Sequence, residues 1–311
     1  MLVSGGSHIQ ASTKKGWKRR LLDAAPDRLQ IAIWSVRRYR WKFGRWPNLI
    51  RPRTFNELLL RRKIWNRDPR IPLLGDKLLA KDYVRETLGD DWIIPTLWSG
   101  TALPPRDRRN WPLPFVVKVN NGCGWNIFVR DEKSCDWNEI EAKCATWMST
   151  HYGWELGEWY YARMPARIMI EPLVNFGRGL PMDVKFWVFH GRAEIIHVVT
   201  NREHGLRQAF FDRDWNRLPY DQGYNTDTGE VARPACLTEM IRGAETLAAG
   251  FSYLRVDLYE VDGKPLFGEL TFCPGAGLDY FNPPEFDLQL VALWLKKRRP
   301  VQHQQAAVAA T

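Results

Sequence analysis

Two β-rich runs on either side of a turn signal, within residues 253–275, constrain the fold of this chain more than any other stretch. The pair Asp262-Gly263 between the runs predicts a β-hairpin. Asp257 in the first run and Glu269 in the second are each surrounded by apolar residues. A buried carboxylate is unfavourable unless it is paired or metal-bound, and two on adjacent strands repel unless a cation or a proton lies between them. The hairpin therefore predicts a platform for a divalent metal and, beside it, for phosphate.

The spacing of the hairpin sets a geometric condition on this metal site. A strict two-residue turn would place Asp257 opposite Gly268, and Glu269 would then point to the other face of the sheet. Shared metal binding therefore requires either a three-residue loop at 262–264 or a bulge. Because Pro265 has no N–H to donate to a ladder, we expect one of these irregular geometries.

The composition is that of a globular protein with room for two or three small domains. Of its 311 residues, 45% are hydrophobic, which excludes a disordered chain. No apolar run approaches the roughly 20 residues that span a bilayer, and residues 1–13 lack the apolar core of a signal peptide. The five cysteines form no C-x-x-C pair, which argues against a zinc site or a disulfide framework. We therefore expect a cytoplasmic protein with reduced thiols.

The positive charge is concentrated at the N-terminus. Residues 1–50 hold eleven Lys or Arg and two acidic residues, so they carry +9 of the net charge of +10. The nearly neutral remainder argues against nucleic-acid binding. Trp34, Trp41 and Trp46 lie among the basic residues, so residues 14–46 are suited to peripheral contact with the anionic inner face of a membrane. The alternative, a helix packed on the body with solvated arginines, is equally consistent with the sequence.

The periodicity of apolar residues predicts an α+β protein that begins with helices. We expect helices over 17–46 (broken at Pro26), 55–65, 77–88, 137–149 and 238–249, and strands over 115–119, 127–129, 167–174, 183–189, 193–200 and 208–211. The predicted domains are a basic helical arm (1–50), a helical region (51–112), a small lid subdomain (113–175), a C-terminal subdomain with the metal site (176–300) and a disordered tail (301–311).

Three further charged residues follow or interrupt predicted strands. Lys118 precedes a glycine-rich loop whose backbone N–H groups could face phosphate oxygens. Glu171 ends a strand, and Lys185 lies among apolar residues. Taken singly, each fits an ordinary structural role better than a functional one. Among the sixteen tryptophans, Trp125 in the glycine loop best fits stacking on a sugar ring.

The order of these features is more specific than any one of them. A strand Lys with a glycine loop is followed by a strand ending in Glu, a second strand Lys, an Arg-x-Asp run and a Glu-x-Thr-x-x-Pro-Gly run. This order resembles the TupA-like family of the ATP-grasp superfamily, which is found with bacterial surface-polysaccharide genes. The matching pieces are Asp76-Lys77 with Lys81 and Arg85, and residues 115–124, 158–171, 183–191, 255–259 and 267–272.

The resemblance implies an ATP-grasp fold, in which two α+β domains hold a nucleotide between them. It implies that Asp257 and Glu269 are Mg²⁺ ligands, with Thr271 where the superfamily usually has a metal-binding Asn. Thr is a shorter, weaker ligand, which implies a looser site or one completed by water. The other implied site residues are Lys77 and Lys118 at the phosphates, Asn121, Gly122 and Gly124 in a mobile lid (121–126), Glu171 and the backbone near Leu173 at the adenine, and Lys185, Arg255 and Gly275 at the reacting groups.

The function implied is an ATP-dependent carboxylate–amine ligase that acts through an acylphosphate. The cofactors would be ATP and Mg²⁺, and the partners a small-molecule or glycan acceptor and an amine. The implied setting is a uronic acid or peptide substituent of a bacterial surface polysaccharide. Three alternatives stay open: a glycan kinase on the same fold, a glycosyltransferase, and a non-catalytic membrane-associated protein.

Overall fold

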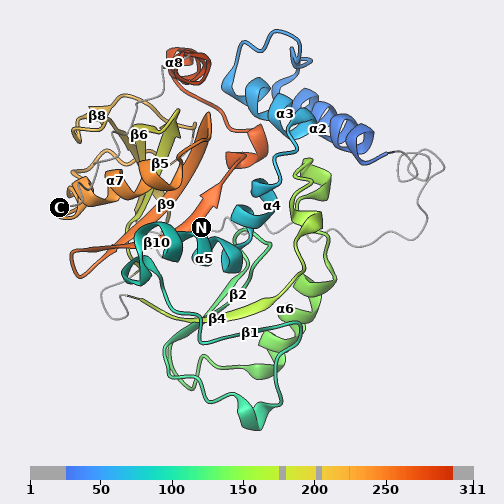
Figure 1. Cartoon of the computed structure of the whole chain (residues 1–311), viewed down its shortest axis with the longest axis vertical. Coiled ribbons are helices and arrows are strands. Elements are labelled where there is room, and N and C mark those ends of the chain that lie inside the picture. The colour runs from blue at the N-terminus through green and yellow to red at the C-terminus, as the bar shows by residue number, and fades with distance from the viewer. Residues whose placement is uncertain (1–25, 175–179, 201–204, 224, 297–311) are drawn as a thin grey trace, which may run out of the picture.

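Two antiparallel sheets organise the computed structural model, which describes residues 26–174, 180–200, 205–223 and 225–296. The smaller sheet has the strand order β1-β4-β2-β3, and the larger has the order β10-β9-β5-β6-β7-β8. Figure 1 shows the larger sheet above and the smaller below, with the short helices α4 (Arg70–Gly75) and α5 (Lys77–Leu88) between them. The predicted α+β class with a helical start is confirmed.

The smaller sheet consists of β1 (Trp98–Gly100), β2 (Phe115–Val119), β3 (Asn126–Val129) and β4 (Ile168–Pro172). Helix α6 (Trp137–Ser149) begins at Asp136, whose side chain accepts hydrogen bonds from the amides of residues 138 and 139. Buried Ile140 and Cys144 of this helix pack with Val117 and Ile170 of the sheet. Because β1 pairs with β4, the sheet includes residues before 113, where the sequence analysis placed the start of this domain.

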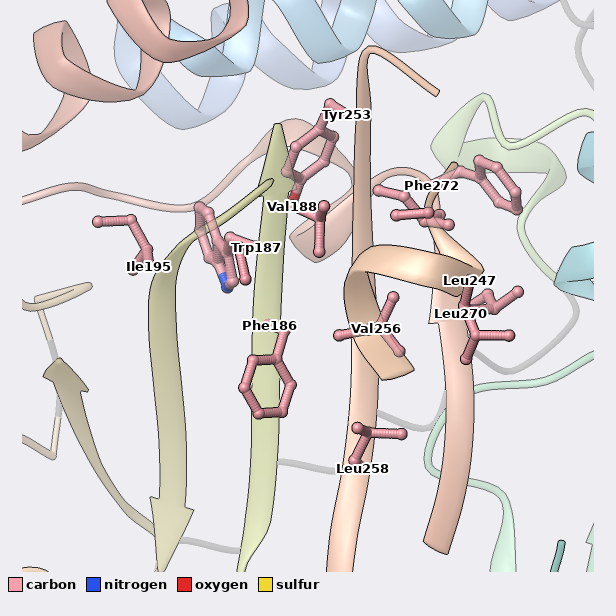
Figure 2. Close-up of a cluster of buried hydrophobic side chains, with 14 of the residues drawn as sticks. Phe186, Trp187, Val188, Ile195, Leu247, Tyr253, Val256, Leu258, Leu270 and Phe272 are labelled. Carbon is pink, nitrogen blue, oxygen red and sulfur yellow. The ribbon is translucent and has the colours of Figure 1, made fainter. Parts of the chain in front are cut away.

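The larger sheet has one apolar face and one face that is polar over part of its length. Its strands are β5 (Asp183–Phe189), β6 (Arg192–Thr200), β7 (Arg207–Phe211), β8 (Arg217–Leu218), β9 (Tyr253–Val261) and β10 (Lys264–Thr271). Phe186, Val256 and Leu270 form a buried cluster with Leu247 of α7 (Leu237–Leu247), as Figure 2 shows. Since side chains alternate along a strand, the intervening residues Lys185, Asp257 and Glu269 point to the other face.

An aromatic cluster covers one end of that other face. Phe55, the first residue of α3 (Phe55–Trp65), lies 5.5 Å from Trp187 and 5.1 Å from Tyr253 between ring centroids. It also contacts Trp294 of α8 (Pro284–Leu295), a helix that the sequence analysis did not predict. Trp187 is two residues from Lys185 on the same strand, so the two side chains lie on the same face of the sheet. The aromatic cluster and the charged site are therefore direct neighbours on this face.

Helix α2 (Asp27–Phe43) packs on the body through one side. Ile31 and Tyr39 are buried. Gly157 lies so close that a Cβ there would be 2.2 Å from the Ser35 hydroxyl oxygen. Arg38 donates to the Glu155 carbonyl oxygen at 2.8 Å. The expected helix over 17–46 is therefore observed from Asp27, while residues 17–25 and the tail 301–311 lie outside the described residues.

No helix in the described ranges is both long and apolar enough to cross a membrane.

Candidate functional site

The hairpin that carries Asp257 and Glu269 has a two-residue turn, and a β-bulge shifts the pairing of its two strands by one residue. Val261 pairs with Lys264 across the turn, and the register shifts between Phe267 and Glu269. The skipped residue is Gly268, where a Cβ would lie 2.9 Å from the Asp257 carbonyl oxygen. Glu269 consequently lies opposite Asp257. Of the two irregular geometries expected, the bulge is confirmed and the three-residue loop is wrong.

A row of polar side chains crosses four neighbouring strands of the larger sheet. Glu269 pairs with Asp257, Asp257 with Lys185, and Lys185 with His197. Residues directly opposite one another share a face, so these four side chains lie side by side on the face away from α7. His197 was missed by the sequence analysis. The available signal was a histidine inside the β-branched run 195–199, a pattern that usually indicates an ordinary core residue.

Two cations hold three carboxylates together in this row. The Lys185 ammonium lies 2.6 Å from both Asp183 Oδ2 and Asp257 Oδ2. Arg255 donates to both oxygens of Asp257, at 2.7 and 2.8 Å. It also reaches Glu269 Oε1 at 3.2 Å. With three carboxylates and two cations, the cluster keeps one excess negative charge.

The electrostatic environment favours the charged forms of Lys185, Arg255 and Glu269. Burial alone would lower the pKa of Lys185, but Asp183 and Asp257 raise it above its usual value. Burial and Asp257 would raise the pKa of Glu269, yet Lys77, Arg255 and Lys185 together lower it. The carboxylate pairs also raise the pKa of Arg255 despite its burial. Glu269 is therefore ready to bind a cation at neutral pH.

The donor set at the hairpin fits Mg²⁺ when phosphate completes it. Arg255 bridges Asp257 and Glu269, so a cation already occupies the position between the two carboxylates. Within the described part of the chain, no three His, Cys, Asp or Glu side chains converge as a metal cage. Mg²⁺ commonly binds one or two carboxylates together with substrate phosphates. The Thr271 hydroxyl donates to Glu269 Oε1 at 2.9 Å and accepts from Arg255 at 3.0 Å, so it lies at the edge of this set.

A second charged cluster lies on the smaller sheet. Lys118 lies 2.6 Å from Glu171 Oε2, and Lys81 of α5 pairs with the other oxygen of the same carboxylate. Burial would raise the pKa of Glu171, but the two lysines outweigh it and hold the pKa below its usual value. Lys81 also donates to the Ile94 carbonyl oxygen at 2.6 Å. The sequence analysis had Lys81 in its matching pieces but did not assign it to the site.

One backbone group at Leu173, which was expected near the adenine, is engaged within the fold. Its amide donates to the Pro114 carbonyl oxygen at 3.0 Å, so that N–H cannot also donate to an adenine ring. Any contact from this segment to a base would have to use another group.

The glycine loop between β2 and β3 is anchored to α5. Lys77 donates through its ammonium to the Gly122 carbonyl oxygen and through its amide to the Asn120 carbonyl oxygen. Gly124 has φ 71°, which favours glycine. The side-chain oxygen of Asn121 is buried, with no hydrogen-bond partner among the described residues. An unsatisfied buried oxygen of this kind could accept a ligand hydrogen bond.

The same loop lies close to the carboxylate row. The pKa of the Cys123 thiol is raised, most by the protein atoms around the sulfur and next by Glu269, while Lys77 and Arg255 lower it. This coupling joins the smaller sheet to the hairpin of the larger one. Trp125, by contrast, stacks on Trp147 with ring centroids 6.0 Å apart and planes 5° from parallel. Its ring is therefore part of the small domain's packing, which corrects the expectation of a sugar platform.

Gly275 begins a left-handed turn next to the hairpin. Gly275, Ala276 and Gly277 all have positive φ, at 54°, 53° and 71°. A Cβ on Gly275 would lie 2.1 Å from a carboxylate oxygen of Asp279, so a side chain there would collide as well as strain the backbone. No acceptor for the Gly275 amide is found among the described residues. The Ala276 amide donates to the Cys273 carbonyl oxygen at 3.0 Å, so of these two amides it is that of Gly275 that can face an anion.

The comparison with protein families shows to which family the chain belongs. The model of the family described as TupA-like ATPgrasp matches residues 57–295, which is most of the chain. The chain belongs to the TupA-like ATP-grasp family. No curated protein matches it.

Solved structures resemble this ATP-grasp chain only distantly. A D-alanine–D-alanine ligase from Bacillus anthracis is 16% identical, with a TM-score of 0.43, and the alignment covers 71% of this chain and 65% of the ligase. An L-amino acid ligase from Bacillus licheniformis is 16% identical, with a TM-score of 0.35, and the alignment covers 64% of this chain and 44% of that ligase. N5-carboxyaminoimidazole ribonucleotide synthetase from Thermus thermophilus is 12% identical, with a TM-score of 0.38, and the alignment covers 70% of this chain and 51% of the synthetase. The chain thus spans about half to two thirds of the length of these proteins.

A buried acid behind the row of this ATP-grasp protein was also missed. Glu158 accepts a hydrogen bond from the Tyr160 hydroxyl at 2.6 Å. Burial raises its pKa to about 7, with Glu269 adding to the rise and Lys63 opposing it. The Lys63 ammonium donates to the carbonyl oxygens of Leu156 and Ala276, at 2.7 and 2.6 Å. Lys63 therefore ties the segment before Glu158 to the left-handed turn at Gly275.

The structure thus gathers the predicted site residues into two groups. Asp257, Glu269, Thr271, Lys185 and Arg255 form one contiguous network on the larger sheet. The second group connects Lys118 with Glu171. Lys77 joins the groups, because it contacts the glycine loop and acts on Glu269.

Proposed function

We propose that this protein is an ATP-dependent carboxylate–amine ligase that uses Mg²⁺. The observation that carries the proposal is the in-register row of Glu269, Asp257 and Lys185, with the glycine loop close to it. One excess negative charge on a sheet face suits a metal together with phosphate, because the neighbouring glycine loop follows Lys118 of β2 and is anchored by Lys77 of α5. Membership of an ATP-grasp family supports ATP as the phosphate donor.

Asp257 and Glu269 would hold the metal, which offsets the negative charge on the transferring phosphoryl oxygens. Arg255 would shift from its bridging position or stay on Asp257 alone, since it makes two contacts there and a longer one to Glu269. Lys185 is positioned beside Asp257 to meet the γ-phosphate. Lys118 on the smaller sheet and Lys77 at the start of α5, between the two sheets, would meet the other phosphates.

The reaction has two transfers. The γ-phosphoryl group passes from ATP to a carboxylate oxygen of the acceptor, and ADP leaves. The amine nitrogen then attacks the carbonyl carbon, the bond from that carbon to the phosphate oxygen breaks, and phosphate leaves while the nitrogen loses a proton. The Gly275 amide is the donor we assign to the oxyanion that develops during this attack.

Asp279 is a candidate to hold the amine as an ammonium ion and to accept the proton that this ion must lose before its nitrogen can attack. Its carboxylate lies against Gly275, and the Gln222 side-chain amide approaches one of its oxygens at 3.4 Å. Burial raises its pKa, although Arg255 and Lys42 act in the opposite direction. A carboxylate with so little compensation gains most from an incoming cation.

For the acceptor, we propose a uronic acid or a peptide substituent on a bacterial surface polysaccharide. The support is the family resemblance alone, because Trp125 is engaged with Trp147. The same site could phosphorylate a hydroxyl group, which would make the protein a glycan kinase.

The experiment that tests the proposal supplies ATP, Mg²⁺ and candidate acceptors, with hydroxylamine as a general amine. A ligase releases ADP and phosphate and forms a hydroxamate, in a reaction that needs both the carboxylate and hydroxylamine. A kinase forms ADP and a phosphorylated acceptor without free phosphate. Stabilisation against heat by a uridine diphosphate sugar but not by ATP would instead indicate a glycosyltransferase and contradict the proposal.

A further inference from the structure

The outer side of α2 and the segment after it carry exposed apolar and basic side chains together. We call this the Arg–Trp surface, made of Arg37, Arg40, Trp41, Trp46, Ile50 and Arg51. Trp41, Trp46 and Ile50 are 83%, 66% and 86% exposed. Large apolar side chains so exposed in one short segment indicate a surface for contact with another body.

The position of this surface follows from how α2 packs. Ile31, Ser35 and Tyr39 point into the body, which turns Arg37 and Trp41 outward on the helix. The Arg40 guanidinium lies 5.6 Å from the centre of the Trp46 ring, so the helix and the following segment form one continuous surface. Trp46 and Ile50 also line a hollow of about 470 Å³ with Val36 and Leu49.

The segment that forms this surface carries no negative charge to balance its arginines. The sequence contains no acidic residue between Asp27 and Glu57. Glu57 is buried and binds Arg45 at 2.9 Å, along with the amide of Arg53. In the described ranges, Arg37, Arg40 and Arg51 make no ion pair. Their charge is therefore available to an external anion.

We propose that the Arg–Trp surface docks the protein onto an anionic lipid bilayer. Arginines would lie at the headgroup phosphates, while indole rings and an aliphatic side chain enter the interface. A second copy of the chain is a poor occupant, because it would bring the same positive charge. A nucleic-acid strand would use the arginines and indoles, but it leaves Ile50 and the aliphatic hollow without a partner. Packing on the body and contact with a membrane thus use opposite sides of one helix.

The test is co-sedimentation of the full-length protein with vesicles of phosphatidylcholine alone or with a quarter phosphatidylserine. The parent should pellet with the anionic vesicles in low salt and be released by salt. Removing the whole N-terminal segment is unsuitable, because it would delete the buried Tyr39 contact with Glu57. Substitutions on the exposed side avoid this difficulty.

The deciding variant is Arg37→Glu with Arg40→Glu. Losing two arginines should reduce the partition coefficient at least thirty-fold, which is about 2 kcal/mol at 1.4 kcal/mol per tenfold. The matched control is Arg108→Glu with Lys264→Glu, which makes the same charge change at exposed positions elsewhere. Trp46→Ala with Ile50→Ala should weaken the binding that remains in moderate salt.

Several outcomes would overturn the proposal. One is a parent that does not pellet with anionic vesicles. Another is equal loss in the deciding variant and its control, which would assign the binding to general charge or to the basic residues before Asp27. A third is binding of a single-stranded oligonucleotide, or self-association in sedimentation velocity, that the deciding variant abolishes while vesicle binding stays unchanged.

Discussion

The two sheets of this protein bury charged clusters of opposite net charge. On the smaller sheet, two lysines surround the single carboxylate of Glu171. On the larger sheet, Lys185 and Arg255 are outnumbered by three carboxylates. The difference supports the proposal that the two halves meet different parts of one ligand. The lysine-rich cluster suits an anion, and the carboxylate-rich cluster suits a cation, as a metal–nucleotide complex requires.

The clusters also differ in what each carboxylate does for the fold. Asp257 is 2% exposed and neutralises two buried cations. The Glu269 side chain is 32% exposed, makes one longer contact to Arg255 and accepts a hydrogen bond from the Thr271 hydroxyl. One carboxylate of the proposed metal pair therefore neutralises buried cations within the fold, while the other is more exposed and held by fewer contacts.

The largest effect expected is from Asp257→Asn. The change leaves Lys185 and Arg255 buried with reduced compensation, so unfolding should become easier by about 3–5 kcal/mol. Glu269→Gln is the matched control. It should lower the free energy of unfolding by less than about 1 kcal/mol, but it should abolish turnover. Urea unfolding and ADP release measure the two effects. Equal stability of both variants would remove the distinction between the carboxylates.

Glu158→Gln should show an effect that depends on pH. The folded pKa of about 7 lies above the ordinary 4.5, so the native state keeps a proton that the unfolded chain has lost. The contribution of Glu158 is therefore fully present below pH 4.5 and is lost as the pH rises to 7. The amide should stabilise the protein by about 3 kcal/mol above pH 7 and leave it nearly unchanged at pH 4.5. Denaturant unfolding across this range measures it, with exposed Glu86→Gln as the control; parallel profiles for parent and variant would contradict the assignment.

Lys118→Ala tests the lysine-rich cluster. Loss of one charge-assisted phosphate contact should weaken ATP binding by about 1.5–3 kcal/mol. Glu171 keeps its pairing with Lys81, so the fold should survive. Lys143→Ala, an exposed lysine on α6 in the same domain, is the control. Titration calorimetry that gives the same ATP affinity for all three proteins would exclude Lys118 from the nucleotide site.

Gly268→Ala should disturb the bulge that aligns the metal pair. The new Cβ would meet the Asp257 carbonyl oxygen at 2.9 Å and the Tyr259 ring at 3.1 Å. Overpacking of this kind costs about 1–3 kcal/mol. We expect weaker Mg²⁺-dependent ATP binding along with the lower melting temperature. An alanine variant that melts like the parent would show that the bulge tolerates a side chain.

The sequence was sufficient for most of the elements, though not for β1 or α8, and for the residues whose signal is local. Asp257 and Glu269 could be found because carboxylates in apolar strand runs are rare. From the sequence, the bulge could be predicted only as one of two possibilities, the other being a three-residue loop. Its position depends on the approach of Gly268 to a carbonyl on the facing strand. Glu158 could not be found, because its burial and its raised pKa depend on Lys63 and Glu269, which are far away in the chain.

His197 and the α2 helix show the same limit in different ways. A neutral histidine within β-branched residues gives no sign that it will stand beside Lys185. For α2, the sequence offered membrane contact and packing on the body as rivals. The packing of Ser35 against Gly157 assigns one side of the helix to the body and leaves the opposite side exposed.

The measurement that tests the central claim most directly is calorimetric titration of the full-length protein with ATP, in Mg²⁺ and in EDTA. We predict binding that requires Mg²⁺ in the parent and loses this requirement together with most of its affinity in Glu269→Gln, while the melting temperature stays the same. Tight ATP binding in EDTA, or a Glu269→Gln variant that binds Mg²⁺ and ATP like the parent, would contradict the assignment of the Asp257–Glu269 pair to the metal–nucleotide complex.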